Sequence, residues 1–539
     1  MAETLAAPPS LLNSYDEVPY ESHPFAQTHP SRLFTIGTLF GMRPTPVQRC
    51  RVLELGCAAG GNLIPMADLL PDSEFIGIDL SDRQILEGQA MVKEFGLKNL
   101  TLKTASIMDV DASYGMFDYV ICHGVFSWVP KDVQDKVYEI CAKQMTPNGV
   151  AYISYNTYPG WHLRGMIRDM MRYHSARFNT AQLRTQQARA LLDFLAQSVK
   201  QDGSAYAVLL KTELETLRHQ ADHYLYHEHL EENNQPLYFH QFADRAKAHG
   251  LKYLGEARVG TMVTGNFGPE IEKTLRMLAT DQVQAEQYMD FLRNRMFRET
   301  LICLDRVQPN WAVNPESLRV LHVASAAKAV NAEGNPLTDV PVKTEDTVSY
   351  KSPAGMSMGT NRPLLKACMQ VLSAAYPATL PFESLRKQAR ELIGGAEPAD
   401  PKQALEDIQV IAIGLLNCYM GSDLVELHGM PINFAKQPGD HPTATALARL
   451  QASKAPMVTN RRHEVVRLNE LDRHLVPLLD GKNDRSQLVE KLTTIAQTGA
   501  LNVQKDGLTI YDAKEIHTAL TSIIDQAVAN VARMALLVA

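Results

Sequence analysis

The stretch "VLELGCAAGGN" at residues 52–62 places a short apolar run directly before a turn rich in glycine and alanine. This order is typical of a buried parallel strand that leads into a loop binding a nucleotide or nucleoside. Strand and helix patterns then alternate from residue 51 to 155, through "EFIGID", a helix over 81–95, "FDYVICHG" and "GVAYISY". Alternation of this kind predicts a parallel sheet with helices on both faces, whose ligand binds at the carboxyl ends of the strands.

The residues of the loop indicate which of the cofactors that bind to such sheets this chain takes. A dinucleotide loop follows G-x-G-x-x-G because its backbone must approach a pyrophosphate. Here Glu54 lies two residues before Gly56. Ala58 stands where a middle glycine is expected, before Gly60. S-adenosylmethionine (SAM) has no phosphate, and an acid near the loop suits its cationic amino group. Asp79 ends the next strand, where a carboxylate can accept both ribose hydroxyls of NAD or SAM, so the acid before the loop favours SAM.

Two further strand ends complete the predicted cofactor pocket. Ser106 and the backbone of Ile107 follow the third strand and are expected to meet the adenine edge, with Asp109 at its exocyclic amine. His123 and Gly124 follow the fourth strand and are expected to face the methionine part of the cofactor. For Ser106 and Asp109 the alternative is a plain strand end whose polar side chains face solvent.

An aromatic and polar cluster follows the fifth strand, in "SYNTYPGW". Methyl transfer from a sulfonium to an amine is an in-line displacement, so the protein has mainly to hold a neutral amine close to the methyl group and exclude water. The predicted catalytic residues are Asn156, Tyr158, Tyr155 and Trp161, with Trp128 on the neighbouring loop and with Tyr15 and Tyr20 of the N-terminal segment beside the cofactor. The alternative is that some of these residues are core aromatics or turn residues.

These motifs resemble class I SAM-dependent methyltransferases. In addition, "YDEVPYESHPFAQTHPSRL" before the loop and "HEHLEENNQPLYFHQFADRAKAHGLKYLGEA" after it resemble the bacterial subgroup with a methyltransferase-regulatory domain. Rickettsial lysine methyltransferases of outer-membrane proteins belong to this subgroup. The resemblance does not by itself fix the acceptor, but together with the large accessory domains it makes protein lysine the leading one, with a protein partner such as an outer-membrane protein before export. Two alternatives stay open: a small-molecule O- or N-methyltransferase with regulatory accessory domains, and a non-catalytic SAM-binding interaction protein.

The predicted fold is of the α/β class, with a Rossmann-like class I methyltransferase core, a helical middle domain and a winged-helix-like C-terminal region. The expected division of the chain is a lid segment over 1–45, the core over 46–165, the middle domain over 166–305, a linker or small strand element over 306–363 and the C-terminal region over 364–539. The short helical pattern inside the lid is expected to cap the core, not to belong to it. Asp484 with Gln487 predicts a capping box for one C-terminal helix.

Composition narrows the remaining classes of function. The net charge of −7 gives no whole-chain basic field, and an N-P-P-Y type motif is missing after the fourth strand, so no nucleic-acid partner is expected. The seven cysteines are scattered without a C-x-x-C pair, which favours a reduced, cytoplasmic protein without a disulfide framework. The first twenty residues lack the basic region of a secretory signal, and no apolar stretch is long enough to span a bilayer, so no membrane insertion is expected.

Three histidines in the predicted middle domain have helical spacing. His219, His223 and His227 stand at i, i+4 and i+8, which predicts three imidazoles on one face of a helix over 211–230. The H-E-x-x-H glutamate is missing and no cysteine joins the set, so we expect a polar helix face and no metal.

Overall fold

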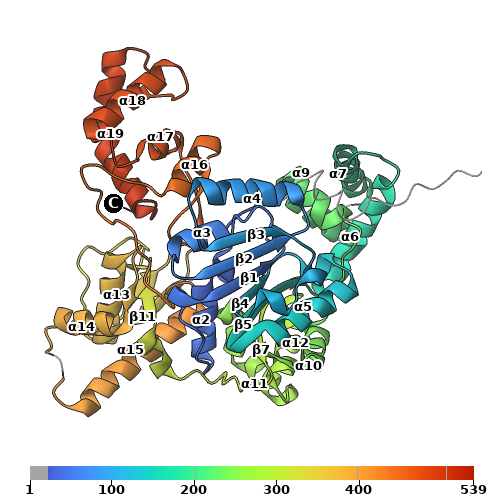
Figure 1. Cartoon of the computed structure of the whole chain (residues 1–539). Coiled ribbons are helices and arrows are strands. Elements are labelled where there is room, and N and C mark those ends of the chain that lie inside the picture. The colour runs from blue at the N-terminus through green and yellow to red at the C-terminus, as the bar shows by residue number, and fades with distance from the viewer. Residues whose placement is uncertain (1–21, 201, 397, 506, 539) are drawn as a thin grey trace, which may run out of the picture.

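The computed structural model describes residues 22–200, 202–396, 398–505 and 507–538. A seven-stranded sheet in the order β3-β2-β1-β4-β5-β7-β6 forms its centre (Figure 1). The five parallel strands are β1 (Arg51–Leu55), β2 (Glu74–Asp79), β3 (Leu100–Thr104), β4 (Phe117–Cys122) and β5 (Met145–Asn156). The strand order reverses between β1 and β4, and ligands of such sheets bind in the crevice at that reversal. The Rossmann-like core predicted from the sequence is confirmed.

Two strands of this sheet come from the region expected to be a separate helical domain. β7 (Phe297–Leu304) pairs antiparallel with β5, and β6 (Leu251–Glu256) pairs antiparallel with β7. The sequence predicts a strand within "GLKYLGEARVG", but the residues of a strand do not reveal its partner. The core over 46–165 is therefore not complete in itself, and part of the middle region over 166–305 closes its sheet.

Helices cover both faces of the sheet, and each face has its own hydrophobic cluster. The covering helices are α3 (Leu63–Leu69), α4 (Asp82–Glu94), α5 (Lys131–Gln144) and α10 (Phe239–Ala248), while α12 (Gln282–Arg293) packs on α10 and α11 (Pro269–Leu278) packs on α12. Neighbouring residues of a strand point to opposite faces. Val52 and Tyr119 accordingly belong to one cluster, and Leu53 and Val120 to the other.

The helix within the N-terminal segment is part of the core, contrary to the expectation that it only caps it. In α2 (Pro30–Leu39), Leu33 and Ile36 are fully buried and Leu39 is 2% exposed. Their spacing puts them on one helix face, which joins a cluster that continues through Leu318 and Leu365 to Leu447. The helix therefore joins the sheet to the C-terminal half, and the described residues before it, 22–29, lie over the loop after β1.

A helical insertion between β5 and β6 has a small core of its own. It contains α6 (Gly160–Ser175), α7 (Ala181–Ser198), α8 (Ala205–Arg218), α9 (Asp222–Leu225) and a π-helix, η6 (Tyr226–Leu230). The expectation of three histidines on one helix face is wrong, because α8 ends at Arg218 and a new helix, α9, begins at Asp222. His219 is exposed, His227 is buried, and the side chain of His223 lies outside the described part. Within the described ranges, no group of three or more His, Cys, Asp or Glu residues is placed to hold a metal.

The C-terminal half has two parts. The first shares the core of α2 and holds α13 (Pro363–Ala375), α14 (Phe382–Leu392) and α15 (Pro401–Gly421), with small sheets made of β8 (His322–Ala324), β9 (Lys328–Val330), β10 (Val348–Lys351), β11 (Ser357–Thr360), β12 (Leu380–Pro381) and β13 (Glu426–His428). The second part, which we call the C-terminal module, spans residues 440–536.

The C-terminal module has a hydrophobic core separate from the rest. Its elements are α16 (Ala446–Lys454), β14 (Met457–Thr459), β15 (Val465–Arg467), α17 (Glu470–Leu475), α18 (Arg485–Gln497), β16 (Gln504–Lys505), β17 (Leu508–Thr509) and α19 (Ala513–Arg533). Figure 1 shows α17, α18 and α19 standing away from the central sheet. The predicted capping box is confirmed, since Asp484 and Gln487 each accept the backbone N–H of the other. None of the helices described across the chain is both long and apolar enough to cross a bilayer.

Candidate functional site

The loop after β1 has a backbone that glycine favours at two positions. Gly56 and Gly60 have φ angles of +77° and +75°. A Cβ on Gly56 would lie 2.4 Å from Cγ2 of Val125, so a side chain at this position would collide with the loop after β4. Ala58, at the position of a middle glycine, has a φ of +49°, which is unfavourable for a residue with a Cβ. The loop therefore brings its backbone close to the crevice between β1 and β4.

Glu54 points a carboxylate into this crevice from the end of β1. The residue is 3% exposed, and its Oε1 accepts a hydrogen bond from Asn62 Nδ2 at 2.7 Å. Its Oε2 is buried without a hydrogen-bond partner among the described residues. Burial raises the pKa of Glu54 to about 7, although the bond from Asn62 opposes the shift. A buried carboxylate oxygen without a partner needs a cation or a donor. The amino group of SAM supplies both, so the residues present fit this cofactor.

Asp79, at the end of β2, fastens the loop to the sheet. Its Oδ2 accepts the N–H of Ala58 at 2.9 Å, and its Oδ1 accepts the N–H of Ser81 at 2.9 Å. A carboxylate accepts several hydrogen bonds, which is the chemistry that ribose hydroxyls require. The predicted contact of Asp79 with the ribose stays a prediction.

The end of β3 forms a capped turn. Ser106 Oγ accepts the N–H of Met108, and Asp109 Oδ2 accepts the N–H of Ser106, both at 3.1 Å. Ile107 packs into the core between these two residues, and Asp109 is exposed. Ser106 and Asp109 therefore already have a local structural task. Their contact with adenine, like that of the Ile107 backbone, stays a prediction.

The end of β4 places His123 and Gly124 in the same crevice. His123 Nδ1 lies 2.9 Å from the hydroxyl of Tyr152, and the N–H of Gly124 donates to Ser154 Oγ at 2.8 Å. Burial lowers the pKa of His123 to about 4, so the imidazole is neutral at pH 7. A neutral ring adds no positive charge beside a sulfonium, which suits the predicted place of His123 near the methionine part.

Residues 22–29 cross over the glycine loop. The N–H of Gly61 donates to Ser22 Oγ at 2.7 Å, and the N–H of Phe25 donates to Asn62 Oδ1 at 2.9 Å. The Phe25 ring lies 3.9 Å from the imidazole of His123, centroid to centroid. This placement agrees with a lid over the cofactor. Tyr15 and Tyr20, predicted to contact the cofactor, lie outside the described residues.

Asn156 and Tyr158, predicted to act in catalysis, lie at the end of β5 beside the loop after β4. Asn156 is 4% exposed, its backbone N–H donates to Ser127 Oγ at 2.8 Å, and its Nδ2 donates to Asn234 Oδ1 at 3.0 Å. Tyr158 is half-buried and stacks on His162 with ring centroids 4.0 Å apart. We call this the acceptor edge. Asn234 was not predicted from the sequence, although it lies within the stretch that shows the family resemblance.

Tyr155 lies in the core, on the opposite face of β5 from Asn156, and its predicted catalytic role stays a prediction. It is 1% exposed, stacks on Phe242 of α10 at 4.2 Å and bonds Thr300 Oγ1 through its hydroxyl at 3.1 Å. Successive residues of a strand alternate between faces, so Tyr155 enters the core while its neighbours face the site. Trp161 is 2% exposed and meets Trp128 edge to face at 6.2 Å, which makes both part of a wall. A direct role for Trp161 stays a prediction.

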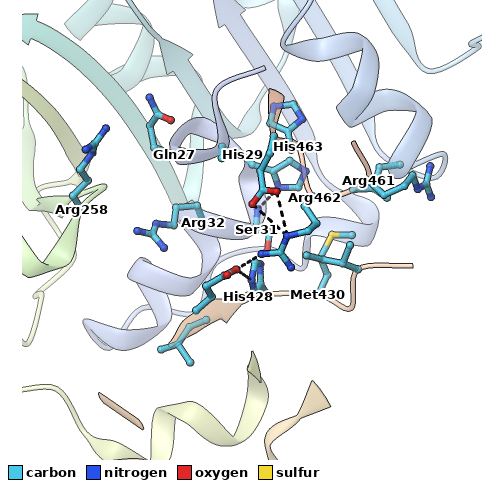
Figure 2. Close-up of a pocket in the computed structure, with 16 residues that line it drawn as sticks. Gln27, His29, Ser31, Arg32, Arg258, His428, Met430, Arg461, Arg462 and His463 are labelled. Carbon is cyan, nitrogen blue, oxygen red and sulfur yellow. Dashed lines mark hydrogen bonds and ion pairs between the residues drawn. The ribbon is translucent and has the colours of Figure 1, made fainter. Parts of the chain in front are cut away.

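The crevice at the ends of β1, β2, β3 and β4, which we call the cofactor edge, also receives a residue from the C-terminal module. His463 Nε2 lies 2.8 Å from Asn62 Oδ1, although 401 residues separate the two along the chain. No sequence pattern pairs them. His463 and His29 line a cavity of about 370 Å³ in which Arg32, Arg258 and other side chains also lie (Figure 2).

Comparisons with known proteins match this organisation along the chain. Three family models match: a methyltransferase domain over 46–234, a predicted methyltransferase regulatory domain over 221–304, and the C-terminal winged helix domain of PKMT over 440–536. An uncharacterized protein of Rickettsia prowazekii is 37% identical over 531 residues, which cover 98% of this chain and 94% of the relative. A second protein of that organism is 46% identical over 241 residues, 45% of this chain and 96% of the relative.

Two solved structures have the same fold throughout. PKMT2 from Rickettsia typhi in complex with AdoHcy superposes with a TM-score of 0.84 at 30% identity, covering 97% of this chain and all of PKMT2. The structure of PKMT2 alone gives a TM-score of 0.82 over the same share. The winged helix predicted from the sequence is thereby confirmed for the module. The sheet, its loop and the full-length matches agree: the chain belongs to the family of SAM-dependent methyltransferases that combine a class I core, a methyltransferase-regulatory domain and a PKMT winged-helix domain.

Proposed function

We propose that this methyltransferase transfers the methyl group of SAM to lysine side chains of protein substrates. The observation that supports this most is the similarity to PKMT2, a protein lysine methyltransferase, because it runs over 97% of the chain at 30% identity and includes the winged-helix module. The insertion and the module also exceed what an enzyme for a small substrate needs. An outer-membrane protein before export is the partner that the resemblance suggests.

The cofactor edge would hold SAM through residues from four strand ends. Glu54 accepts the cationic amino group at its unpartnered Oε2, and the backbone of the glycine loop leaves room for the cofactor. Asp79 accepts ribose hydroxyls. The residues assigned to the remaining parts of the cofactor are Ser106, Ile107 and Asp109 for adenine and His123 and Gly124 for the methionine part, with Gly56 and Gly60 shaping the loop. Bound SAM supplies the methyl group on a sulfonium.

The acceptor edge would position the lysine amine. Asn156 commits its amide nitrogen to Asn234, which leaves its amide oxygen to accept an N–H of the incoming amine. The half-buried ring of Tyr158 offers a face for the aliphatic part of the lysine. An unperturbed lysine has a pKa of about 10.4, and desolvation lowers it toward the neutral form that attacks. Residues 22–29 lie over the adjoining glycine loop and His123. Desolvation beside the sulfonium would favour the neutral amine, whose proton would pass to solvent as the amine enters.

We place the enzyme in the cytoplasm, since its seven cysteines are all free thiols and buried. To test the function, the purified chain is incubated with methyl-labelled SAM and either protein fractions or metabolite extracts from the same cells. We expect label in protein, and mass spectrometry should place the added methyl groups on lysine. Asn156→Ala should strongly reduce the signal in the same fractions. Label confined to metabolites would overturn the lysine proposal and favour the small-molecule alternative.

A further inference from the structure

The C-terminal module meets the methyltransferase core at the tip of the hairpin between β14 and β15. Arg461 Nη1 pairs with Asp68 of α3 at 2.9 Å, and the backbone N–H of Arg461 donates to Ala535 within the module at 2.9 Å. His463, two residues on, is 3% exposed and has a φ of +61°. A non-glycine residue rarely adopts this conformation, and here it turns the imidazole away from the module toward the core.

Asn62 connects that imidazole to the cofactor edge. Its Oδ1 accepts from His463 Nε2 at 2.8 Å and from the N–H of Phe25 at 2.9 Å. Its Nδ2 donates to Glu54 Oε1 at 2.7 Å and to Thr28 Oγ1 at 2.9 Å. These four bonds use the whole capacity of the amide, so its oxygen must face His463 and its nitrogen must face Glu54.

The chemistry of the pair also fixes the state of the imidazole. Asn62 Oδ1 only accepts, so His463 Nε2 must carry the proton. Burial, and next the neighbouring His29, hold the pKa of His463 well below its usual range, so the ring is neutral. It acts as a directed donor to Asn62 and brings no charge toward the cationic cofactor.

The packing beside this contact is loose. A cavity of about 370 Å³ lies along the hairpin, bounded by the start of α2, by Arg258 and by β13 (Figure 2). Because the core of the module is separate, its position relative to α3 depends on the polar contacts at the hairpin tip together with the packing of Leu447. These polar contacts include Arg462, which is 8% exposed, pairs with Glu426 of β13 and donates to the carbonyl of Pro377 at 2.8 Å. The seat of the module is thus set by a few side chains at the hairpin tip.

We propose that His463 is a positioning residue for cofactor binding: it holds the Asn62 amide, and through it the Glu54 carboxylate, so that the seating of the C-terminal module sets the affinity for SAM. The inference rests on the proposed role of Glu54 as the acid that binds the amino group of the cofactor. It gives the winged-helix module a regulatory task, since a partner that moves the hairpin tip would change the affinity for SAM without contacting the cofactor.

The test is the affinity of the full-length protein for AdoHcy, measured by calorimetry without turnover. His463→Leu removes the donor and should weaken binding roughly tenfold, which is the typical worth of one buried hydrogen bond to a polar group. His463→Gln keeps a donor at a similar reach and should stay within about threefold of the wild type. Arg467→Ala is the matched control, because Arg467 is an exposed residue of the same hairpin. It should leave the affinity unchanged.

The Glu54→Gln variant separates this proposal from the assignment on which it rests. If Glu54→Gln binds AdoHcy as the wild type does, the role of Glu54 fails. If Glu54→Gln weakens binding and His463→Leu does not, the link through Asn62 is wrong. In the double variant, His463→Leu should add little to the loss caused by Glu54→Gln. A full additional tenfold loss would overturn the proposal, because the effect would then bypass Glu54. If His463→Leu fails to fold in a thermal melt, the shorter donor His463→Asn replaces it, with the same expected loss.

Discussion

The helical insertion and the C-terminal module each have a hydrophobic core of their own. The insertion lies next to the acceptor edge, and the module contacts the cofactor edge. The insertion is tied to the sheet at both ends, and its first helix, α6, begins two residues after Tyr158 on the acceptor edge. The module follows the sheets and helices around α13–α15 in the chain and reaches the cofactor edge through His463. The comparison suggests that acceptor recognition and cofactor affinity are set by different parts of the chain. Damage on the acceptor side should then lower kcat, and damage on the cofactor side should raise Kd.

The largest effect is expected at Asp79, which belongs to neither the insertion nor the module and which holds the loop after β1. Asp79→Ala removes two bonds to backbone N–H groups and the proposed ribose contacts. Bonds to a charged group are worth about 1.5–3 kcal/mol each. We expect AdoHcy affinity to fall by more than about a hundredfold in calorimetry. Asp82→Asn, at an exposed position of α4, is the control. An unchanged affinity in Asp79→Ala would refute the assignment of the cofactor edge.

The next effect is expected on the acceptor edge. Asn156→Ala should lower kcat by roughly 10- to 100-fold, because a positioned polar group contributes in the transition state, and should change AdoHcy affinity less than about twofold. Tyr158→Phe should lower kcat less. Steady-state kinetics with the protein fraction that accepts methyl groups gives kcat, and calorimetry gives the Kd for AdoHcy. Equal losses in kcat and AdoHcy affinity would contradict the division between the two edges.

Tyr155→Phe is the matched control for Tyr158→Phe. It removes the bond to Thr300 in the core and should cost about 1 kcal/mol of unfolding free energy. We expect a lower melting temperature with kcat preserved. A selective loss of kcat with an unchanged melting temperature would show that Tyr155 takes part in catalysis.

The pH dependence of cofactor binding provides a third test. The pKa of Glu54 is raised to about 7, so the carboxylate is charged above that pH and neutral below it. Affinity for the cationic amino group should be constant above pH 7 and fall by up to about tenfold per unit below it. The raised pKa has the opposite effect on the stability of the free protein. Glu54 contributes to the free energy of unfolding at low pH, and this contribution is lost as the pH rises through about 7. Calorimetry across pH 5.5–8.5 should show a flat profile for Glu54→Gln.

The parts of this site that the sequence predicts are the local ones. Glu54, Gly56, Gly60 and Asp79 are recognisable because a strand, a loop and the next strand follow each other directly. The contact of Asn62 with His463 depends on how two distant units dock, and no residue pattern encodes it.

The sequence also does not show which residues of β5 belong to the core and which to the site, for a different reason. The pattern "SYNTYPGW" has polar and aromatic residues on both faces of β5, and alternation alone does not say which face holds the ligand. The sequence therefore proposes both residues for the site, although the structure buries Tyr155 in the core and places Asn156 against Ser127 of the loop after β4. In the same way α2 has a clear apolar face, but its burial depends on residues near 318 and 427 that approach only in the folded chain.

The smallest effect is expected at the ion pair that seats the module. Arg461 and Asp68 lie 2.9 Å apart, and the Asp68 side chain is 46% exposed. Exposed pairs of this kind contribute about 0–1 kcal/mol and are screened by salt. Arg461→Ala should therefore weaken AdoHcy binding less than about threefold, with a smaller effect at high ionic strength. A loss as large as that of His463→Leu would mean that charge, and not the bond to Asn62, holds the hairpin tip in place. The module would then respond to ionic strength, whereas the insertion, anchored in the sheet at both ends, would not.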